Sequence, residues 1–265
     1  EISKDYYGNC VGNFNTIEAH TEMTIESRMI VRVNHSLKIP EIESTTVADL
    51  AHEKQNSVML LRLCYPEVIK KENEIYAILN EIDYTNKSII EIAQQCNAYI
   101  FNNFTYSKGI TNIETTIDEI LEIRKGVCQD FAHVLLQLLR TAGIPSRYVS
   151  GYICPNESGL RGEGATHAWV EIYSPNQGWL GLDPTNNIWT MDNHVKLSVG
   201  RNFYDCTLVK GTFKGLSKQT LSVSVSIGYE DGRKFEEINN VQLEKVSEAV
   251  QEQLDYIEQQ QQQQQ

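Results

Sequence analysis

The sequence predicts an α+β protein: after an N-terminal β segment, helices lead to one buried central helix, and strands follow it. Apolar side chains cover much of the circumference of residues 128–143, which is typical of a helix buried on most sides. Gly143 and Pro145 are ordinary signals for the end of that helix. Three segments with strand composition follow it in the chain: 146–154, 167–173 and 178–183.

Two capping boxes predict further helices ahead of the central one. Ser88 is followed three residues later by Glu91, and Thr116 by Glu119; each pair can satisfy N–H groups at a helix start. Cys96 falls on the apolar face of the first of these helices. We therefore interpret Cys96 as a small buried hydrophobic residue rather than as a reactive thiol.

The N-terminal residues 1–40 are predicted to belong to a small β domain, present in part. Apolar and polar side chains alternate over residues 22–33, which indicates a half-buried strand. The tripeptide Tyr-Gly-Asn at 7–9 is typical of a hairpin turn. Residues 41–87 are assigned as a linker and helical segment, with the polar stretch 40–57 as the linker.

The main domain is expected at residues 88–230, and a C-terminal helix at 231–258. Apolar residues alternate with serines over 221–227, which predicts a strand. Apolar residues recur at helical spacing from 243 to 257, which predicts an amphipathic helix. The glutamine run at 259–265 is of low complexity and is predicted to be disordered.

Charge and cysteine content restrict the function. The 265 residues carry a formal net charge of -12, and the sequence pI is near 5.0. This balance argues against a nucleic-acid partner, which requires a basic face. Six scattered cysteines without a C-x-x-C pair favour a reduced, cytoplasmic setting. No apolar run approaches the roughly 20 residues of a membrane span, and no signal peptide is evident, so no membrane partner is expected.

Cys128 lies at the predicted start of the central helix, two residues after Gly126. The positive end of a helix and its unpaired N–H groups favour a thiolate, which is the nucleophilic form of cysteine. Gly126 is expected to let a substrate backbone approach closely. The alternative is a thiol that only fills space at a helix start.

His167 and Asp183 are the residues that could serve such a thiol as base and orienting acid. His167 lies where a glycine-containing loop enters a predicted strand, and Asp183 ends the next strand, before Pro184. If the two strands pair as neighbours, Asp183 can accept the Nδ1 proton of His167 and stabilise the imidazolium. A core histidine and an Asp-Pro turn are the alternatives. Asp130 is a rival acid, although near a helix start it more simply complements the dipole.

The remaining histidines are weaker candidates for the base. His133 lies on the predicted central helix, more than one turn from Cys128, and is interpreted as a core residue. The other four fall in segments without a further chemical pattern: His20, His35, His52 and His194.

Three segments resemble the transglutaminase-like superfamily, specifically its bacterial cysteine-protease-like branch. They are Gly-Val-Cys-Gln-Asp-Phe-Ala at 126–132, His-Ala-Trp-Val-Glu at 167–171 and Trp-Leu-Gly-Leu-Asp-Pro-Thr at 179–185. The resemblance covers most of residues 88–230 and part of 1–40. One stretch departs from it: 206–209 reads Cys-Thr-Leu-Val where a proline is expected.

The resemblance implies a papain-like α+β core, with the central helix against an antiparallel sheet, and a catalytic triad of Cys128, His167 and Asp183. In the implied chemistry, Cys128 attacks an amide carbonyl of a peptide or protein substrate and His167 protonates the leaving amine. Water or a second amine then resolves the thioester. The backbone N–H of Cys128 is expected to hold part of the oxyanion charge. No cofactor is implied.

A metal site, an inactive binding module and other acyl transfers are the alternatives to this hypothesis. The cysteines and histidines lack the spacing of zinc sites, and no calcium-loop pattern occurs, so metal-independent activity is expected. A catalytically inactive binding module on the same fold is a second class, although an intact triad argues against it. Among enzymes, peptide hydrolysis is preferred to acyl transfer to an amine. Arylamine acetyl transfer is a third option that requires an acetyl-donor site.

Overall fold

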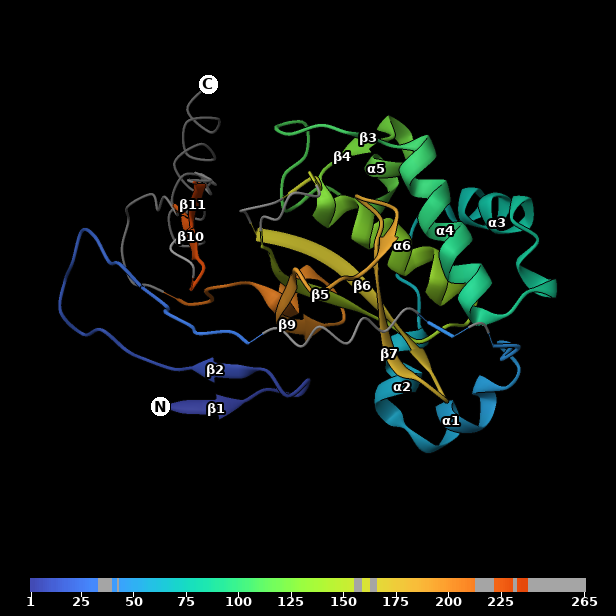
Figure 1. Cartoon of the computed structure of the whole chain (residues 1–265), viewed down its shortest axis with the longest axis horizontal. Coiled ribbons are helices and arrows are strands. Elements are labelled where there is room, and N and C mark those ends of the chain that lie inside the picture. The colour runs from blue at the N-terminus through green and yellow to red at the C-terminus, as the bar shows by residue number, and fades with distance from the viewer. Residues whose placement is uncertain are drawn as a thin grey trace, which may run out of the picture. The chain divides into compact units, whose positions relative to one another are not determined.

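Two compact units make up the chain in the computed structural model, Glu1–Cys206 and Thr207–Gln265. The first unit holds the central sheet and every described helix (Figure 1), so it also holds the predicted site. The structure describes residues 1–32, 40–41, 43–154, 159–162, 166–212, 222–230 and 233–237.

A five-stranded antiparallel sheet forms the centre of the first unit, with the strand order β8-β7-β6-β5-β9. The three strands predicted after the central helix are confirmed as β5, β6 and β7, and each pairs with the next along the chain. The strands span β5 Ser146–Ile153, β6 Thr166–Ser174, β7 Gly178–Asp183, β8 Ile188–Trp189 and β9 His194–Gly200.

Helix α6, Cys128–Thr141, packs against β5 and β6 and confirms the predicted central helix. Its apolar side chains, among them Phe131 and Leu135, are fully buried because other helices cover its remaining sides. Figure 1 shows these helices gathered around α6. They are α3 Glu72–Glu81, α4 Ile89–Asn103 and α5 Ile117–Ile123. The α+β class predicted from the sequence is therefore confirmed.

Both predicted capping boxes are present. The Ser88 hydroxyl accepts from the N–H of Glu91, whose carboxylate accepts from the N–H of Ser88 at 2.9 Å. Thr116 and Glu119 form the same reciprocal pair at the start of α5. Cys96 is fully buried on α4, as predicted.

The remaining elements are short. In the first unit they are β1 Ile2–Lys4, β2 Cys10–Gly12, α1 Leu50–Asn56, α2 Val58–Cys64, η1 Tyr84–Asn86, β3 Thr105–Tyr106, β4 Lys125–Gly126 and η2 Phe203–Cys206. In the second unit, β10 Val225–Gly228 pairs antiparallel with β11 Lys234–Glu237. Among the described helices, none combines the length and apolar character that crossing a membrane requires.

The strand predicted over residues 22–33 is wrong for its described part. Residues 13–32 contain no strand, and Met23, Ile25 and Met29 are about half exposed. An alternating pattern becomes a strand only where a neighbour completes its hydrogen bonds, and no described segment pairs with this stretch. The predicted hairpin at the N-terminus is confirmed, since β1 and β2 flank its turn.

Asn9 fastens that hairpin turn to the sheet. Its side-chain amide donates to the carbonyl of Val199 at 2.7 Å and accepts from the N–H of Val199 at 2.8 Å. Asp5 in turn accepts from the N–H groups of Tyr7 and Asn9. The Asn9 amide thus substitutes for a neighbouring strand and caps part of the exposed edge of β9.

Two segment assignments differ from the structure. Helix α1 begins at Leu50, which is fully buried, so the linker does not extend to residue 57. Good helix formers in this stretch and the burial of Leu50 outweigh its polar composition. Within 231–258, Lys234–Glu237 is strand rather than helix because it pairs with β10. The helical pattern at 243–257 and the glutamine run lie outside the described residues.

Candidate active site

Cys128 is the first residue of α6, and its side chain is partly exposed. The parallel pairing of β3 with β4 leads the chain to this point, with Tyr106 opposite Gly126. The first N–H groups of a helix have no partner within that helix. The start of α6 therefore offers hydrogen-bond donors and positive partial charge to a thiolate or an oxyanion.

Asp130 caps this helix start and does not orient the histidine. Its Oδ2 accepts from the N–H of Val127 at 2.8 Å and from the hydroxyl of Thr111 at 2.6 Å. A Cβ atom on Gly126 would lie 2.5 Å from the same oxygen. Gly126 therefore makes room for the cap, and the expectation that a substrate backbone uses this space is wrong, because Asp130 fills it.

His167 and Asp183 form a buried hydrogen-bonded pair. Nε2 of His167 lies 2.9 Å from Oδ2 of Asp183, and both side chains are 0% exposed. As expected, β6 and β7 are paired neighbours, which brings the two residues together. One detail differs from the prediction: Nε2 of the ring, not Nδ1, faces the carboxylate.

Nδ1 is the ring nitrogen of His167 that is left for the thiol. It is buried and has no hydrogen-bond partner among the described residues. Gly162 packs over it, since a Cβ atom on Gly162 would lie 2.6 Å from Nδ1. Cys128 is close enough for the charge of its thiolate to raise the pKa of the ring. The structure therefore brings His167 and Asp183 into hydrogen-bonding contact and places Cys128 near the ring of His167.

The charge state of His167 follows from these neighbours. Burial lowers the pKa of His167, but the Asp183 carboxylate and the Cys128 thiolate outweigh it and raise the pKa to about 10. Burial opposes ionisation of Asp183 as well, yet the charge of His167 and hydrogen bonds from His167, His194 and Asn186 hold its pKa well below the usual range. At neutral pH the site therefore holds an imidazolium against a carboxylate.

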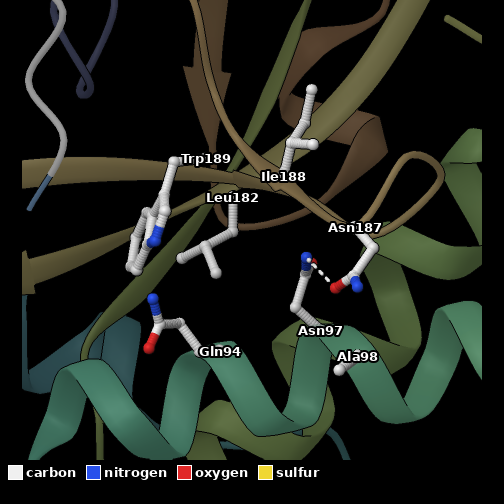
Figure 2. A pocket seen from close by; sticks show the side chains of 7 residues that line it. All are labelled: Gln94, Asn97, Ala98, Leu182, Asn187, Ile188 and Trp189. Atoms are coloured by element: carbon white, nitrogen blue, oxygen red, sulfur yellow. Dashed lines mark hydrogen bonds between the residues drawn. The ribbon is translucent and has the colours of Figure 1, made fainter.

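Hydrogen-bond donors surround Asp183. Its Oδ1 accepts from the N–H of Thr185 at 2.9 Å, and its Oδ2 from the side-chain amide of Asn186 at 2.7 Å. Asn97 of α4 donates to the backbone carbonyl of Asp183 at 3.3 Å and to Asn187 at 3.2 Å. Figure 2 shows Asn97 reaching from the helix to Asn187. These bonds fix both the backbone and the rotamer of the carboxylate.

A second histidine meets the same carboxylate and was not found from the sequence. His194, the first residue of β9, places Nε2 3.3 Å from Oδ2 of Asp183, and its side chain is 1% exposed. Val195, Leu197 and Val199 alternate with polar residues in this strand, and that pattern predicts the opposite face for His194. No local motif marks this residue as part of a site.

His167, Asp183 and His194 also have the side-chain types of a metal site, with candidate ligand atoms within 4.8 Å of one another. Both histidines, however, direct Nε2 to one carboxylate oxygen at hydrogen-bonding distance. An ionised carboxylate only accepts hydrogen bonds, so both nitrogens carry protons in this arrangement. This geometry favours a hydrogen-bond network, and metal analysis of the purified protein tests the alternative directly.

Three of the other cysteines lie in surroundings that suppress reactivity. Burial raises the pKa of Cys96 to about 12, and the pKa values of Cys64 and Cys206 to about 11. His133 is partly buried on α6, where its ring packs beside Tyr148. Its Nε2 accepts from the N–H of Phe203 at 3.2 Å, and burial lowers its pKa to about 4.

A hollow of about 350 Å³ lies among residues that neighbour the site along the chain and across the β3–β4 pair. Through Tyr106 it borders the β3–β4 pair that leads to the helix start, and through Arg161 it borders Gly162, which covers His167. The guanidinium of Arg161 lies 5.2 Å from the ring centre of Phe101. The lining residues are Phe101, Phe104, Thr105, Tyr106 and Arg161.

Comparison with known proteins identifies the class. The model of the transglutaminase-like superfamily matches residues 76–184, which include all three residues of the predicted triad. An uncharacterized protein of Mycobacterium tuberculosis is 32% identical over 85% of this chain and 76% of its own length. An uncharacterized protein of Mycobacterium leprae is 30% identical over 84% of this chain and 79% of its own length.

Some of the matches carry a functional description. The structure of a predicted cysteine protease from Cytophaga hutchinsonii superposes with a TM-score of 0.50 and 26% identity, over 62% of this chain and 53% of that one. This chain thus spans about half of the Cytophaga protein. A protein-glutamine gamma-glutamyltransferase of Pseudomonas aeruginosa is 37% identical over 90 residues, 32% of this chain and 14% of its own length.

Fold and comparisons agree on the class of protein. A helix that begins at a cysteine and packs on an antiparallel sheet is the papain-like α+β architecture that the resemblance implied. The chain belongs to the transglutaminase-like superfamily.

Proposed function

We propose that the protein is a thiol-dependent amide hydrolase, a cysteine peptidase acting on a peptide or protein. Cys128 is the nucleophile, His167 the general acid and base, and Asp183 the orienting carboxylate. The supporting observation is the buried His167–Asp183 pair beside a partly exposed thiol at a helix start. An adjacent imidazolium and a helix N-terminus both favour the thiolate.

Acylation begins when the Cys128 thiolate attacks the substrate carbonyl carbon, which forms a C–S bond and an oxyanion. The backbone N–H of Cys128 donates to that oxyanion. His167 then gives its Nδ1 proton to the leaving amine, and the C–N bond breaks. A thioester remains on Cys128, and His167 is neutral with its Nε2–H still directed to Asp183.

Deacylation reverses these roles. Nδ1 of His167 takes a proton from water as the water oxygen attacks the thioester carbonyl. The C–S bond breaks, the acid product leaves, and the thiolate and imidazolium are restored. Asp183 stays ionised throughout and holds the ring orientation.

Transfer to an amine is the second candidate. The same acyl-enzyme gives a new amide if an amine attacks in place of water, and His167 accepts the amine proton in the same way. The 90-residue match to a gamma-glutamyltransferase supports this alternative. Whether water or an amine reaches the thioester decides between the two reactions.

The acyl donor is proposed to enter along the hollow beside Tyr106 and Arg161. The aromatic walls suit apolar groups of a substrate, and the guanidinium of Arg161 suits a carbonyl or carboxylate oxygen. A substrate in this hollow would lie between Tyr106, beside the strand that leads to Cys128, and Arg161, next to the glycine that covers His167.

Trapping the acyl-enzyme tests the proposal. The protein is incubated with p-nitrophenyl acetate, quenched in acid and examined by peptide mass spectrometry. Acetyl on Cys128 that hydroxylamine removes is expected, with none at this position in Cys128→Ala. Acetylation confined to other residues rejects the proposal. Repeating the reaction with a primary alkylamine and measuring acid against amide product separates hydrolysis from transfer.

A further inference from the structure

His194 occupies a position that the proposed mechanism does not use. Its ring lies 6.3 Å from the ring of His167 and edge-on to Trp169 at 5.4 Å, while Trp169 also stacks on His167 at 6.4 Å. The two imidazoles and the indole thus pack as a cluster around the Asp183 carboxylate. The His194 side chain is only 1% exposed, so its ring nitrogens form hydrogen bonds with the protein rather than with solvent.

A bulge in β9 directs His194 to this cluster. The register of β9 on β5 shifts between Ser150 and Gly151, and Leu197 is the extra residue. Side chains alternate between the faces of a sheet, so one extra residue reverses the alternation beyond it. His194 therefore shares a face with Trp169, whereas an unbroken strand would turn it to the opposite face.

Gly151 permits the bulged strand to come close. A Cβ atom on Gly151 would lie 2.1 Å from the carbonyl oxygen of Val195 and 2.6 Å from the ring of Trp169. Any larger residue at this position would push β9 away and carry His194 with it. A bulge next to a site is a common device for aiming a side chain.

The protonation of His194 follows from its partners. The carboxylate of Asp183 only accepts, so Nε2 of His194 carries a proton and donates to it. Nδ1 then accepts from the N–H of Met191 at 3.2 Å, with Oδ1 of Asn193 3.1 Å from the same nitrogen. One ring nitrogen faces the carboxylate, and the other holds the turn before β9.

We propose that His194 is a positioning residue whose Nε2–H holds the Asp183 carboxylate in the rotamer that receives His167. The inference rests on the triad of the proposed function. Oδ2 of Asp183 receives donors from His167 on β6, His194 on β9 and Asn186 after β7. Without the donor from β9, the carboxylate gains freedom to turn, and its ionised form loses one stabilising bond.

Two substitutions separate positioning from local structure. In His194→Asn, the amide oxygen occupies the place of Nδ1 and can accept from Met191, but no donor reaches Asp183. In His194→Gln, the amide nitrogen occupies the place of Nε2 and can donate to Asp183. Cys128 alkylation by iodoacetamide, p-nitrophenyl acetate hydrolysis and melting temperature are measured for both variants across pH.

His194→Asn is expected to lose roughly 10- to 100-fold in ester hydrolysis, the usual cost of removing a partner that orients a site residue. The acid limb of its alkylation profile should move to higher pH, because Asp183 then protonates more readily. His194→Gln should keep most of the wild-type rate and profile.

Three results would overturn the proposal. Wild-type behaviour of His194→Asn would show that Asp183 needs no second histidine. Rates that fall in both variants in proportion to melting temperature would make His194 a structural residue. Absence of His167-dependent reactivity at Cys128 in the wild type would reject the triad itself, and thereby distinguish failure of the proposed function from failure of this inference.

Discussion

Burial acts on two histidines of this protein in the same direction, yet only one of them keeps its proton at neutral pH. Burial lowers the pKa of His133, in the middle of α6 beside Tyr148 and Phe203, to about 4. Burial acts on His167 in the same direction, but Asp183 and the Cys128 thiolate raise its pKa to about 10. Glu67 also acts on His133 through its charge, but only His167 has a carboxylate hydrogen-bonded to its ring, and this bond accounts for the difference in charge.

Replacing Asp183 should have the largest effect, because it makes the surroundings of His167 resemble those of His133. In Asp183→Asn the pKa of His167 should fall below its ordinary value of about 6.5. Activity should drop by about 10⁴-fold, the size seen when a triad acid becomes an amide. NMR titration of the histidine rings and kcat/KM measure the two effects. A His167 pKa still near 10 would contradict the comparison. An unchanged NMR resonance of His133 shows that the variant is folded.

The two histidines should also give the free energy of unfolding opposite pH dependences. The contribution of His167 is complete below its unfolded pKa of about 6.5 and is lost as pH rises to about 10. That of His133 is complete above about 6.5 and is lost as pH falls to about 4.

Urea unfolding across this range checks both limbs, each on the order of 3–5 kcal/mol at about 1.4 kcal/mol per pKa unit. Asp183→Asn should flatten the alkaline limb, and His133→Gln the acid limb. Unchanged limbs in both variants would show that other groups control the pH dependence.

Removing His133 should damage stability and leave the chemistry intact. His133→Leu leaves the N–H of Phe203 without its acceptor, which should cost about 1–3 kcal/mol. The alkylation rate of Cys128 should stay at the wild-type value at temperatures where the variant is folded. A loss of thiol reactivity without a loss of stability would mean that His133 acts on the site.

Arg161→Ala should have the smallest effect. Loss of the guanidinium should raise KM for a peptide substrate roughly 2- to 10-fold and leave kcat unchanged, since one hydrogen bond to the substrate contributes about 0.5–1.5 kcal/mol. Arg62→Ala is the matched control, because Arg62 stacks on Tyr6 of the N-terminal hairpin at 5.1 Å. Equal effects of the two substitutions would remove Arg161 from the substrate path.

The sequence alone predicted the parts of the site that local patterns encode. The apolar pattern and the stop signals Gly143 and Pro145 placed Cys128 at a helix start, and the strand pattern placed His167 and Asp183 on successive strands, which pair as neighbours. The strand predicted over 22–33 failed because alternation does not reveal whether a partner exists.

What the sequence could not show depends on register and on side-chain packing. His194 reaches Asp183 only because Leu197 forms a bulge in β9, and the alternation of apolar and polar residues does not predict such a bulge. Asn186 and Asn97 hold Asp183 through side-chain bonds that depend on tertiary contacts. The ring orientation of His167 is likewise a product of packing.

The most direct test of the central claim is the rate of alkylation of each cysteine by iodoacetamide at about pH 6, below the ordinary thiol pKa of about 8.5. Peptide mass spectrometry follows wild type and His167→Ala. We expect Cys128 to react faster than the other five cysteines and to lose this advantage without His167. A Cys128 that reacts no faster than the others, or equally fast without His167, would contradict the assignment of these residues as a thiol active site.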